Sequence, residues 1–297
     1  MCKNQEKIKA ALNRIDECLA TINTDEDYLA FLRFQSRFYT YSASNAMLLY
    51  LQNPEASYVK GYKAWNKLGR YVKKGATGIA ILAPLLGKVE VFKEPENKAE
   101  YHDAEGEKEV KKVVKGFRVV YVYDIADTDG DDSQIPILVK GLAGNSEEEK
   151  LIYERLYAFV SRELTIREVT GTASKGSFNL ETKVISIRRD LDYVHKAHTL
   201  LHEYSHYLDF QMYPDENISR NCRELRAESI CFVVMLRLGY DTSSYSMGYI
   251  QSWLRDKQEL KQIADAVQKI SFKIINQLAE SSDFASFRLK EDESDEF

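Results

Sequence analysis

Long apolar runs are absent from this 297-residue sequence, in which no stretch reaches the roughly 18 consecutive apolar residues of a membrane-spanning helix. Residues 1–20 also lack an apolar run, so we expect neither a secretory signal nor a membrane partner. Cysteine is scarce, and its residues form no CxxC pair, which excludes a zinc knuckle and a thioredoxin-like redox motif. We therefore predict a cytoplasmic protein with reduced thiols at Cys2, Cys18, Cys222 and Cys231.

Acidic residues are missing from residues 57–89, where the chain carries seven basic residues. The formal net charge of −5 argues only weakly against nucleic-acid binding, because a stretch of cations creates a local positive potential whatever the total charge. Acids gather instead in residues 291–297, of which five are acidic. We interpret this segment as a solvated tail.

The length of the chain suits two domains, and Gly141, Gly144 and Asn145 cluster where a linker would lie. We predict an α+β protein. Its N-terminal domain of helices and a small sheet would cover residues 1–140. A mainly helical domain with an edge hairpin would cover residues 146–290, followed by the acidic tail 291–297.

The spacing of apolar residues predicts helices between residues 4 and 52, with Thr24 as an N-cap. Apolar runs predict strands at 79–82 and 119–125. The charged stretch 88–115 between them indicates an exposed hairpin or insertion that is partly mobile. In the second half we expect a hairpin whose second strand is 183–188, and helices at 147–162, 193–210, 222–238 and 247–280.

The helix predicted at 193–210 contains the pattern His202-Glu203-Tyr204-Ser205-His206. Positions i and i+4 share one helix face, so the two imidazoles can bind one Zn²⁺ ion. Glu203 beside them can serve as general base toward a water whose pKa the metal lowers. Chance is the alternative explanation of so short a pattern, but the neighbouring Leu200, Leu201, Tyr207 and Leu208 give this helix the apolar side that a buried active-site helix requires. The HExxH pattern predicts a zinc metallopeptidase domain.

Zinc needs a third protein ligand, and Glu224 and Glu228 lie one helical turn apart downstream. One could coordinate the ion while the other accepts the free N–H of a ligating imidazole, or both could be surface acids paired with nearby arginines. The pattern resembles that of thermolysin-like zincins, which implies that Glu224 is the ligand and that Glu228 orients an imidazole. His198 lies too far from His206 to share one ion, since eight residues span about 12 Å of helix. We expect it in the core or beside the ligands.

The strand predicted at 183–188 gains a role beside such a site. Zincin-like enzymes hold an extended peptide by backbone pairing at an exposed strand edge. Gly171 and Gly176 would let backbone approach closely there. An ordinary edge hairpin without a substrate contact fits the sequence equally well.

Cations and aromatic residues interleave between residues 58 and 75. Single-stranded DNA requires both, because cations track the phosphates while bases stack on aromatic faces. The alternative is a solvated basic face whose aromatic residues, Trp65 above all, belong to the core. The residues that would contact DNA are Lys60, Lys63, Trp65, Lys67, Arg70, Lys73 and Lys74.

Several segments together resemble the ArdC-type antirestriction proteins. They are 41–45 (YSASN), 61–65 (GYKAW), 68–70 (LGR), 72–75 (VKKG) and 117–125 (FRVVYVYDI) in the first half, and HExxH, 224–228 and 248–254 (GYIQSWL) in the second. The resemblance implies a single-stranded-DNA-binding domain fused to a zincin-like metallopeptidase domain, in proteins that protect incoming mobile-element DNA from restriction. The sequence departs from the family at Asp127-Thr128, where Gln-Thr is usual, and in the charged stretch 88–115.

Three functions therefore stay open. The first is a zinc metallopeptidase tethered to single-stranded DNA and acting on an unknown protein substrate. The second is a DNA-coating antirestriction protein whose zinc site is not catalytic. The third is a regulatory protease that cleaves one repressor or host protein and binds no DNA. The intact Glu203 favours catalysis, because a purely structural metal site needs no general base.

Overall fold

The computed structural model describes residues 3–92, 108–131, 146–171, 173–243 and 257–281. It begins with three helices, α1 (Lys3–Thr21), α2 (Asp25–Arg37) and α3 (Ala43–Gln52). The predicted N-cap at Thr24 is confirmed: its hydroxyl accepts from the Asp27 N–H, and the Asp27 carboxylate accepts from the Thr24 N–H. This reciprocal arrangement satisfies two backbone donors that the first helical turn leaves unpaired.

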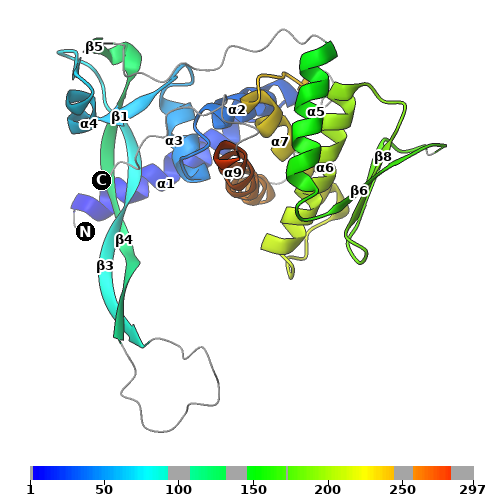
Figure 1. Cartoon of the computed structure of the whole chain (residues 1–297). Helices are drawn as coiled ribbons and strands as arrows, with labels where there is room; N and C mark the ends of the chain where they lie inside the picture. Colours follow the sequence, from blue (N-terminus) through cyan, green and yellow to red (C-terminus); the bar gives the residue numbers. More distant parts are fainter. Residues whose placement is uncertain (1–2, 93–107, 132–145, 172, 244–256, 282–297) are drawn as a thin grey trace.

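The N-terminal sheet has the strand order β1-β4-β3, and all its strands are antiparallel. Its members are β1 (Val59–Gly61), β3 (Ile79–Phe92) and β4 (Lys108–Asp124). Strands β3 and β4 form a long two-stranded ribbon that extends away from the helices (Figure 1). The exposed hairpin predicted from the charged stretch is confirmed for the described residues, and both strands extend further along the chain than predicted. Residues 93–107 lie outside the described part.

The chain between β1 and β3 forms α4 (Tyr62–Lys67) and β2 (Arg70–Val72). After β4 the short helix η1 (Ile125–Asp127) leads into β5 (Thr128–Gly130), which pairs with β2 in a separate two-stranded sheet.

The free edge of β3 is covered near its start, at Ala80 and Leu82, by two side-chain amides from α3. Asn45 donates from Nδ2 to the Leu82 carbonyl and accepts from the Leu82 N–H through Oδ1, both at 2.9 Å. Gln52 repeats this double contact with the backbone of Ala80, at 3.0 and 3.1 Å. The two amides thus take the hydrogen bonds that a further strand would make.

The C-terminal half packs the helices α5 (Ser146–Val160), α6 (Tyr193–Met212), α7 (Arg220–Arg237) and α9 (Lys257–Glu280) beside a three-stranded sheet. The sheet consists of β6 (Thr165–Val169), β7 (Gly176–Asn179) and β8 (Val184–Arg188) in the order β6-β8-β7. The predicted hairpin is confirmed as β7–β8, but β8 is the central strand and its edges are both paired. The prediction of 183–188 as an exposed edge is therefore wrong. Strand β6, which the sequence analysis missed, pairs in parallel with β8 and leaves β7 as the edge beside α6.

One hydrophobic cluster joins the two halves, because α1, α2 and α3 contribute to the same buried core as α5, α6, α7 and α9. Buried polar contacts cross the same junction: the Tyr28 hydroxyl lies 2.8 Å from Ser229 Oγ, and Gln35 Nε2 donates to the Ala264 carbonyl at 2.9 Å. The predicted α+β class is confirmed, with helices and small sheets in the first half and a helical second half that carries a hairpin. The domain limits at residues 140 and 146 stay a prediction, because residues 132–145 lie outside the described part of the chain. Among the described helices, none is both long and apolar enough to cross a membrane.

Candidate metal centre

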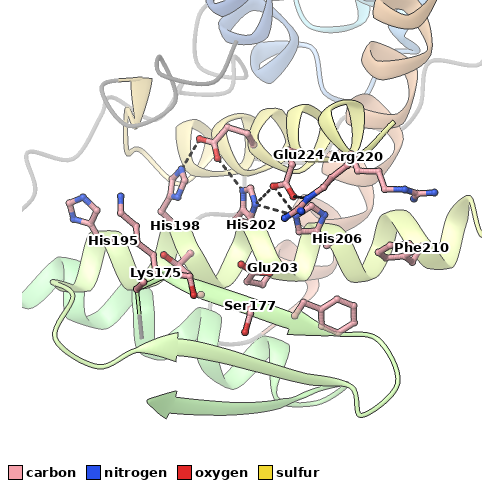
Figure 2. A pocket seen from close by; sticks show the side chains of 17 residues that line it. Lys175, Ser177, His195, His198, His202, Glu203, His206, Phe210, Arg220 and Glu224 are labelled. Carbon is pink, nitrogen blue, oxygen red and sulfur yellow. Dashed lines mark hydrogen bonds and ion pairs between the residues drawn. The ribbon is translucent and has the colours of Figure 1, made fainter. Parts of the chain in front are cut away.

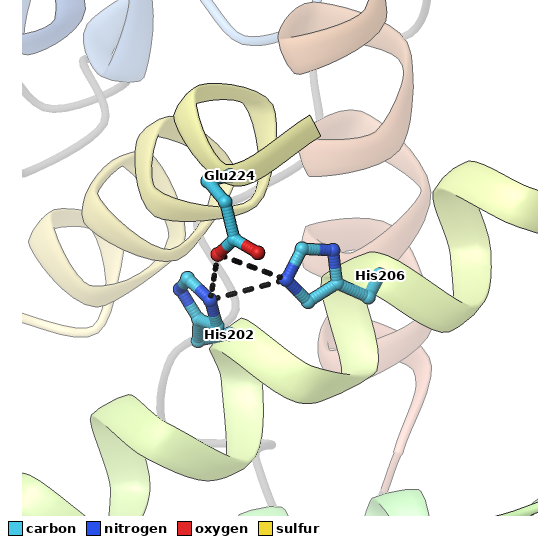
Figure 3. A group of neighbouring side chains, drawn as sticks. All are labelled: His202, His206 and Glu224. Carbon is cyan, nitrogen blue, oxygen red and sulfur yellow. Dashed lines mark hydrogen bonds and ion pairs between the residues drawn. The ribbon is translucent and has the colours of Figure 1, made fainter. Parts of the chain in front are cut away.

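Helix α6 carries the HExxH pattern and presents both of its histidines to α7. Its N-terminus is capped by Asp192, whose carboxylate accepts from the His195 N–H at 2.8 Å. Leu200, Leu201 and Leu208 are fully buried, which fixes the rotation of the helix about its axis. His202 and His206 lie on another face, and Glu224 projects toward them from α7 (Figure 3).

Three potential ligand atoms converge at this point, two imidazole nitrogens and a carboxylate oxygen. The Nε2 atoms of His202 and His206 are 3.2 Å apart, and Glu224 Oε2 lies 3.4 Å from the first and 3.5 Å from the second. In a tetrahedral zinc site with bonds of about 2.0–2.1 Å, ligand atoms lie about 3.3–3.4 Å apart. The three side chains fit one divalent ion without rearrangement.

Glu228 of α7 forms hydrogen bonds with His198 and with the Nδ1 atom of His202 that points away from the cluster. Its Oε2 lies 3.1 Å from His202 Nδ1, and its Oε1 lies 3.1 Å from His198 Nε2. An N–H at Nδ1 of His202 leaves the lone pair of Nε2 directed at the cluster, which is the tautomer that metal ligation requires. His198 lies beside the ligands and outside the cluster, as its position in the sequence predicts.

The ionisation of these groups shows how the site favours a cation. Burial disfavours a charged His202, but its hydrogen bonds to Glu224 and Glu228 outweigh burial and raise its pKa to about 10. Hydrogen bonds to His202 and His206 hold the pKa of Glu224 well below its usual range. Burial opposes ionisation of Glu228, yet hydrogen bonds from His198 and His202 still lower its pKa. Two ionised carboxylates therefore face the imidazoles, an arrangement that attracts a proton or a metal ion.

Glu203 lies between α6 and the edge strand β7. Burial raises its pKa, while the charges of His202 and His206 and a hydrogen bond from the Phe178 backbone oppose this shift. A Cβ atom on Gly176 would lie only 2.4 Å from Thr199 Cγ2 and 3.2 Å from Glu203 Oε1. The absence of a side chain at Gly176 therefore lets β7 pass directly beside this carboxylate. Gly171 does not share that role: a Cβ atom added there would meet nothing within 4 Å, and its φ of +76° is one that favours glycine.

The cluster opens into a cavity of about 870 Å³ between α6, α7 and β7 (Figure 2). The three converging side chains and Glu203 line this cavity, and the edge strand β7 forms one side of it. Cationic side chains stand around it, namely Lys175, Arg220 and Arg223. Of these, Arg220 is 91% exposed, with its Nε 3.8 Å from Glu224 Oε1.

Three of the seven residues predicted to contact DNA are buried within the N-terminal half. Trp65 is 0% exposed and donates from its indole N–H to the Tyr123 carbonyl, so neither of its faces is available to a base. Arg70 is 6% exposed and donates to Thr128 Oγ1 and to the carbonyls of Thr128 and Gly130. Lys60 is 5% exposed and lies over the Tyr58 ring. These three predicted contacts are not supported, because the side chains already hold the fold together.

The other four predicted residues, Lys63, Lys67, Lys73 and Lys74, are exposed. Tyr62 and Tyr71, which are not among the seven predicted contacts, are 54% and 62% exposed near them in the chain, so Tyr62 does not belong to the core as the alternative interpretation held. Lys73 Nζ donates to the Ala126 carbonyl and lies 3.5 Å from Asp129. Exposed cations and exposed aromatic rings therefore still alternate along this stretch, but the rings are those of Tyr62 and Tyr71 and not that of Trp65.

Comparisons with known proteins relate the first half to a family and the fold to a solved structure. Residues 6–123 match the family of the N-terminal domain of anti-restriction factor ArdC. The Mn(II)-bound crystal structure of the antirestriction ArdC protein from the R388 plasmid has a TM-score of 0.53 and 20% sequence identity, and the match covers 91% of this chain and 98% of that one. The metal-free structure of the R388 protein has a TM-score of 0.48 and 22% identity, covering 84% of this chain and 86% of that one.

A curated relative extends the sequence likeness into the second half. The uncharacterized protein pXO2-81 of Bacillus anthracis is 24% identical over 313 residues, which covers 90% of this chain. The match takes in 51% of that relative, so this chain spans about half its length. The first half of this chain thus matches the ArdC N-terminal domain family, and the chain as a whole shares the fold of the R388 protein.

Proposed function

We propose that this protein binds one divalent metal ion, zinc by preference, through His202, His206 and Glu224. The observation that carries the proposal is the convergence of these three ligand atoms at tetrahedral spacing, with Glu203 beside them in an open cavity. Two imidazoles with one carboxylate form a ligand set typical of catalytic zinc, which keeps its fourth position for water or substrate. The R388 protein has been crystallised in a Mn(II)-bound form, and a divalent ion in this chain agrees with that.

We further propose a hydrolytic role of the metallopeptidase type. A divalent ion held at this site supplies Lewis-acid catalysis. Glu203 takes the proton of the attacking water and passes it to the leaving amine, and its raised pKa brings it closer to the range of an effective general base and acid. Glu228 keeps His202 in the ligating tautomer throughout.

An extended polypeptide is the substrate class that the cavity suits best. Strand β7 has one edge paired with β8 and the other beside the cavity. A peptide added along this edge would gain backbone hydrogen bonds irrespective of its sequence. The backbone of a peptide bound there would lie close to Glu203, since Gly176 places no side chain between the strand and this carboxylate.

For the N-terminal half we propose binding of single-stranded DNA, and for the whole protein an antirestriction role on incoming DNA. The match to the ArdC N-terminal domain and the exposed lysines with Tyr62 and Tyr71 support this proposal. Cations would contact phosphates and the tyrosine rings would stack on bases, with little sequence preference.

The decisive experiment compares the wild type with Glu203→Gln. Glutamine nearly matches glutamate in shape but cannot accept the water's proton. We expect zinc content by elemental analysis to stay near one ion per chain, and hydrolysis of a fluorogenic peptide library to fall about 100-fold or more. An unchanged rate would refute the hydrolytic role. Protection of DNA in cells separates the remaining hypotheses: if it persists in this variant, the protein protects DNA as a binding protein and not as a peptidase.

A further inference from the structure

A buried ionic network joins α6 to α7 within one helical turn of His206 and Glu224 along the two helices. Arg226 from α7 donates through Nη1 to Asp209 Oδ1 of α6 at 3.1 Å. The same guanidinium makes a two-pronged contact with Glu216 from the connecting loop, at 2.6 Å from Nη1 and 2.9 Å from Nη2. Arg223 completes the network by donating to Asp209 Oδ2 at 3.2 Å and to the Glu216 carbonyl at 2.8 Å.

Stability alone does not account for this arrangement. Arg226 and Asp209 are each 1% exposed. Removing two charges from water costs about as much as their mutual attraction returns, so apolar residues at such positions often serve stability equally well. What an ion pair with forked hydrogen bonds adds is direction, because a guanidinium donates to carboxylates only along its N–H vectors.

The position of the network in the sequence indicates what this direction serves. Asp209 follows His206 by three residues on α6, and Arg223 and Arg226 flank Glu224 on α7. The network therefore fixes the rotation of α7 about its axis, and its position along that axis, where the helix carries Glu224. Metal ligands tolerate errors of only about 0.2 Å in bond length, so a small slip of one helix would take Glu224 Oε2 out of reach of an ion held by the two imidazoles.

We propose that Asp209 and Arg226 are positioning residues for the metal centre, and that their pairing sets Glu224 at ligating distance from His202 and His206. This inference rests on the proposed metal-binding function. It assigns the network to the geometry of the site, and not to the stability of the fold.

The test replaces the buried pair by apolar residues of similar size, Asp209→Leu with Arg226→Met in one chain. Glu168→Leu with Lys196→Met is the matched control. It removes the contact in which the largely buried Lys196 of α6 bonds both oxygens of Glu168 on β6, at 3.0 and 3.1 Å, away from α7. Zinc affinity is measured by competition with a chelator, coordination geometry by the visible absorption of the Co(II)-substituted proteins, and folding by thermal unfolding of the metal-free proteins.

We expect the Asp209–Arg226 double variant to stay folded, to bind zinc about 10–100-fold more weakly, and to lose the intense tetrahedral Co(II) bands. The control should keep wild-type affinity and spectrum. If the folded double variant also keeps both, or if the control loses as much, the inference is overturned. Should the double variant fail to fold, Arg226→Lys keeps the charge without the fork, and wild-type affinity there overturns the inference equally. A wild type that binds neither zinc nor Co(II) would refute the proposed function itself, which is a separate outcome.

Discussion

Adding one methyl group at Gly176 tests how closely β7 and α6 are packed. The new Cβ would lie 2.4 Å from Thr199 Cγ2, whereas carbon atoms in contact lie about 3.5–4.0 Å apart. The overlap therefore exceeds about 1 Å. Thr199 is only 5% exposed and β-branched, so its side chain has little freedom to yield. Overpacking of this kind costs about 1–3 kcal/mol, and we expect Gly176→Ala to lower Tm by roughly 2–10 °C.

The matched control is Gly171→Ala, which changes stability for a different reason. Its φ of +76° strains an L-residue by about 1–2 kcal/mol, but the added methyl meets nothing within 4 Å. Both variants should therefore unfold at lower temperature. Only Gly176→Ala should also reduce peptide hydrolysis, because its Cβ would stand 3.2 Å from Glu203 Oε1.

A second substitution identifies the colliding atom. Thr199→Ser removes the Cγ2 methyl group, so Gly176→Ala should cost less in this background than in the wild type, as measured by denaturant unfolding in a double-mutant cycle. Equal costs in the two backgrounds would show that the collision with Thr199 is not the cause, and the close approach of β7 to α6 would have to be abandoned as the explanation.

Three further outcomes follow from the geometry. Glu224→Ala should lose the metal in elemental analysis whereas His198→Ala should largely keep it, and equal loss in both would mean that the third ligand is misassigned. Replacing Lys63, Lys67, Lys73 and Lys74 by Gln should weaken single-stranded DNA binding. The slope of log K against log salt concentration should become less steep by at most about 2.8, because each of four phosphate contacts contributes about 0.7. An unchanged slope would exclude these lysines as phosphate contacts. Trp65→Ala should instead destabilise the fold by about 3–5 kcal/mol in chemical denaturation, because the indole is fully buried, and a small cost would contradict its place in the core.

Local patterns allowed much of this structure to be predicted. The capping residues at Thr24, the helical apolar spacing of α6 and the i, i+4 placement of the histidines are encoded within a few residues of one another, so sequence alone indicates them. The closeness of Glu224 to these histidines depends on how α7 packs against α6, and its assignment came from resemblance to zincins.

The errors concern contacts between distant segments. Strand β6 is as short as β8, and its β-branched Thr165, Ile166 and Val169 carry a strand signal that was overlooked. Its parallel pairing with β8 depends on tertiary contacts and could not be deduced locally. Without β6, strand β8 looks like an edge. The burial of Trp65, Arg70 and Lys60 has the same origin: the partners of the first two, Tyr123 and Thr128, lie more than fifty residues away. An interleaving of cations with aromatic rings is compatible with a nucleic-acid surface and with a polar core, and only the tertiary contacts distinguish the two.

The amides of Asn45 and Gln52 limit the size to which the N-terminal sheet can grow. An open strand edge invites pairing with the edge of another chain, which is a common route to aggregation. At Ala80 and Leu82 every backbone donor and acceptor on that edge is already taken from within the same molecule. Because both amides come from α3, this protection lasts only while the helix is docked. Partial unfolding that releases α3 would therefore expose the backbone of Ala80 and Leu82 to a strand from another copy of the chain.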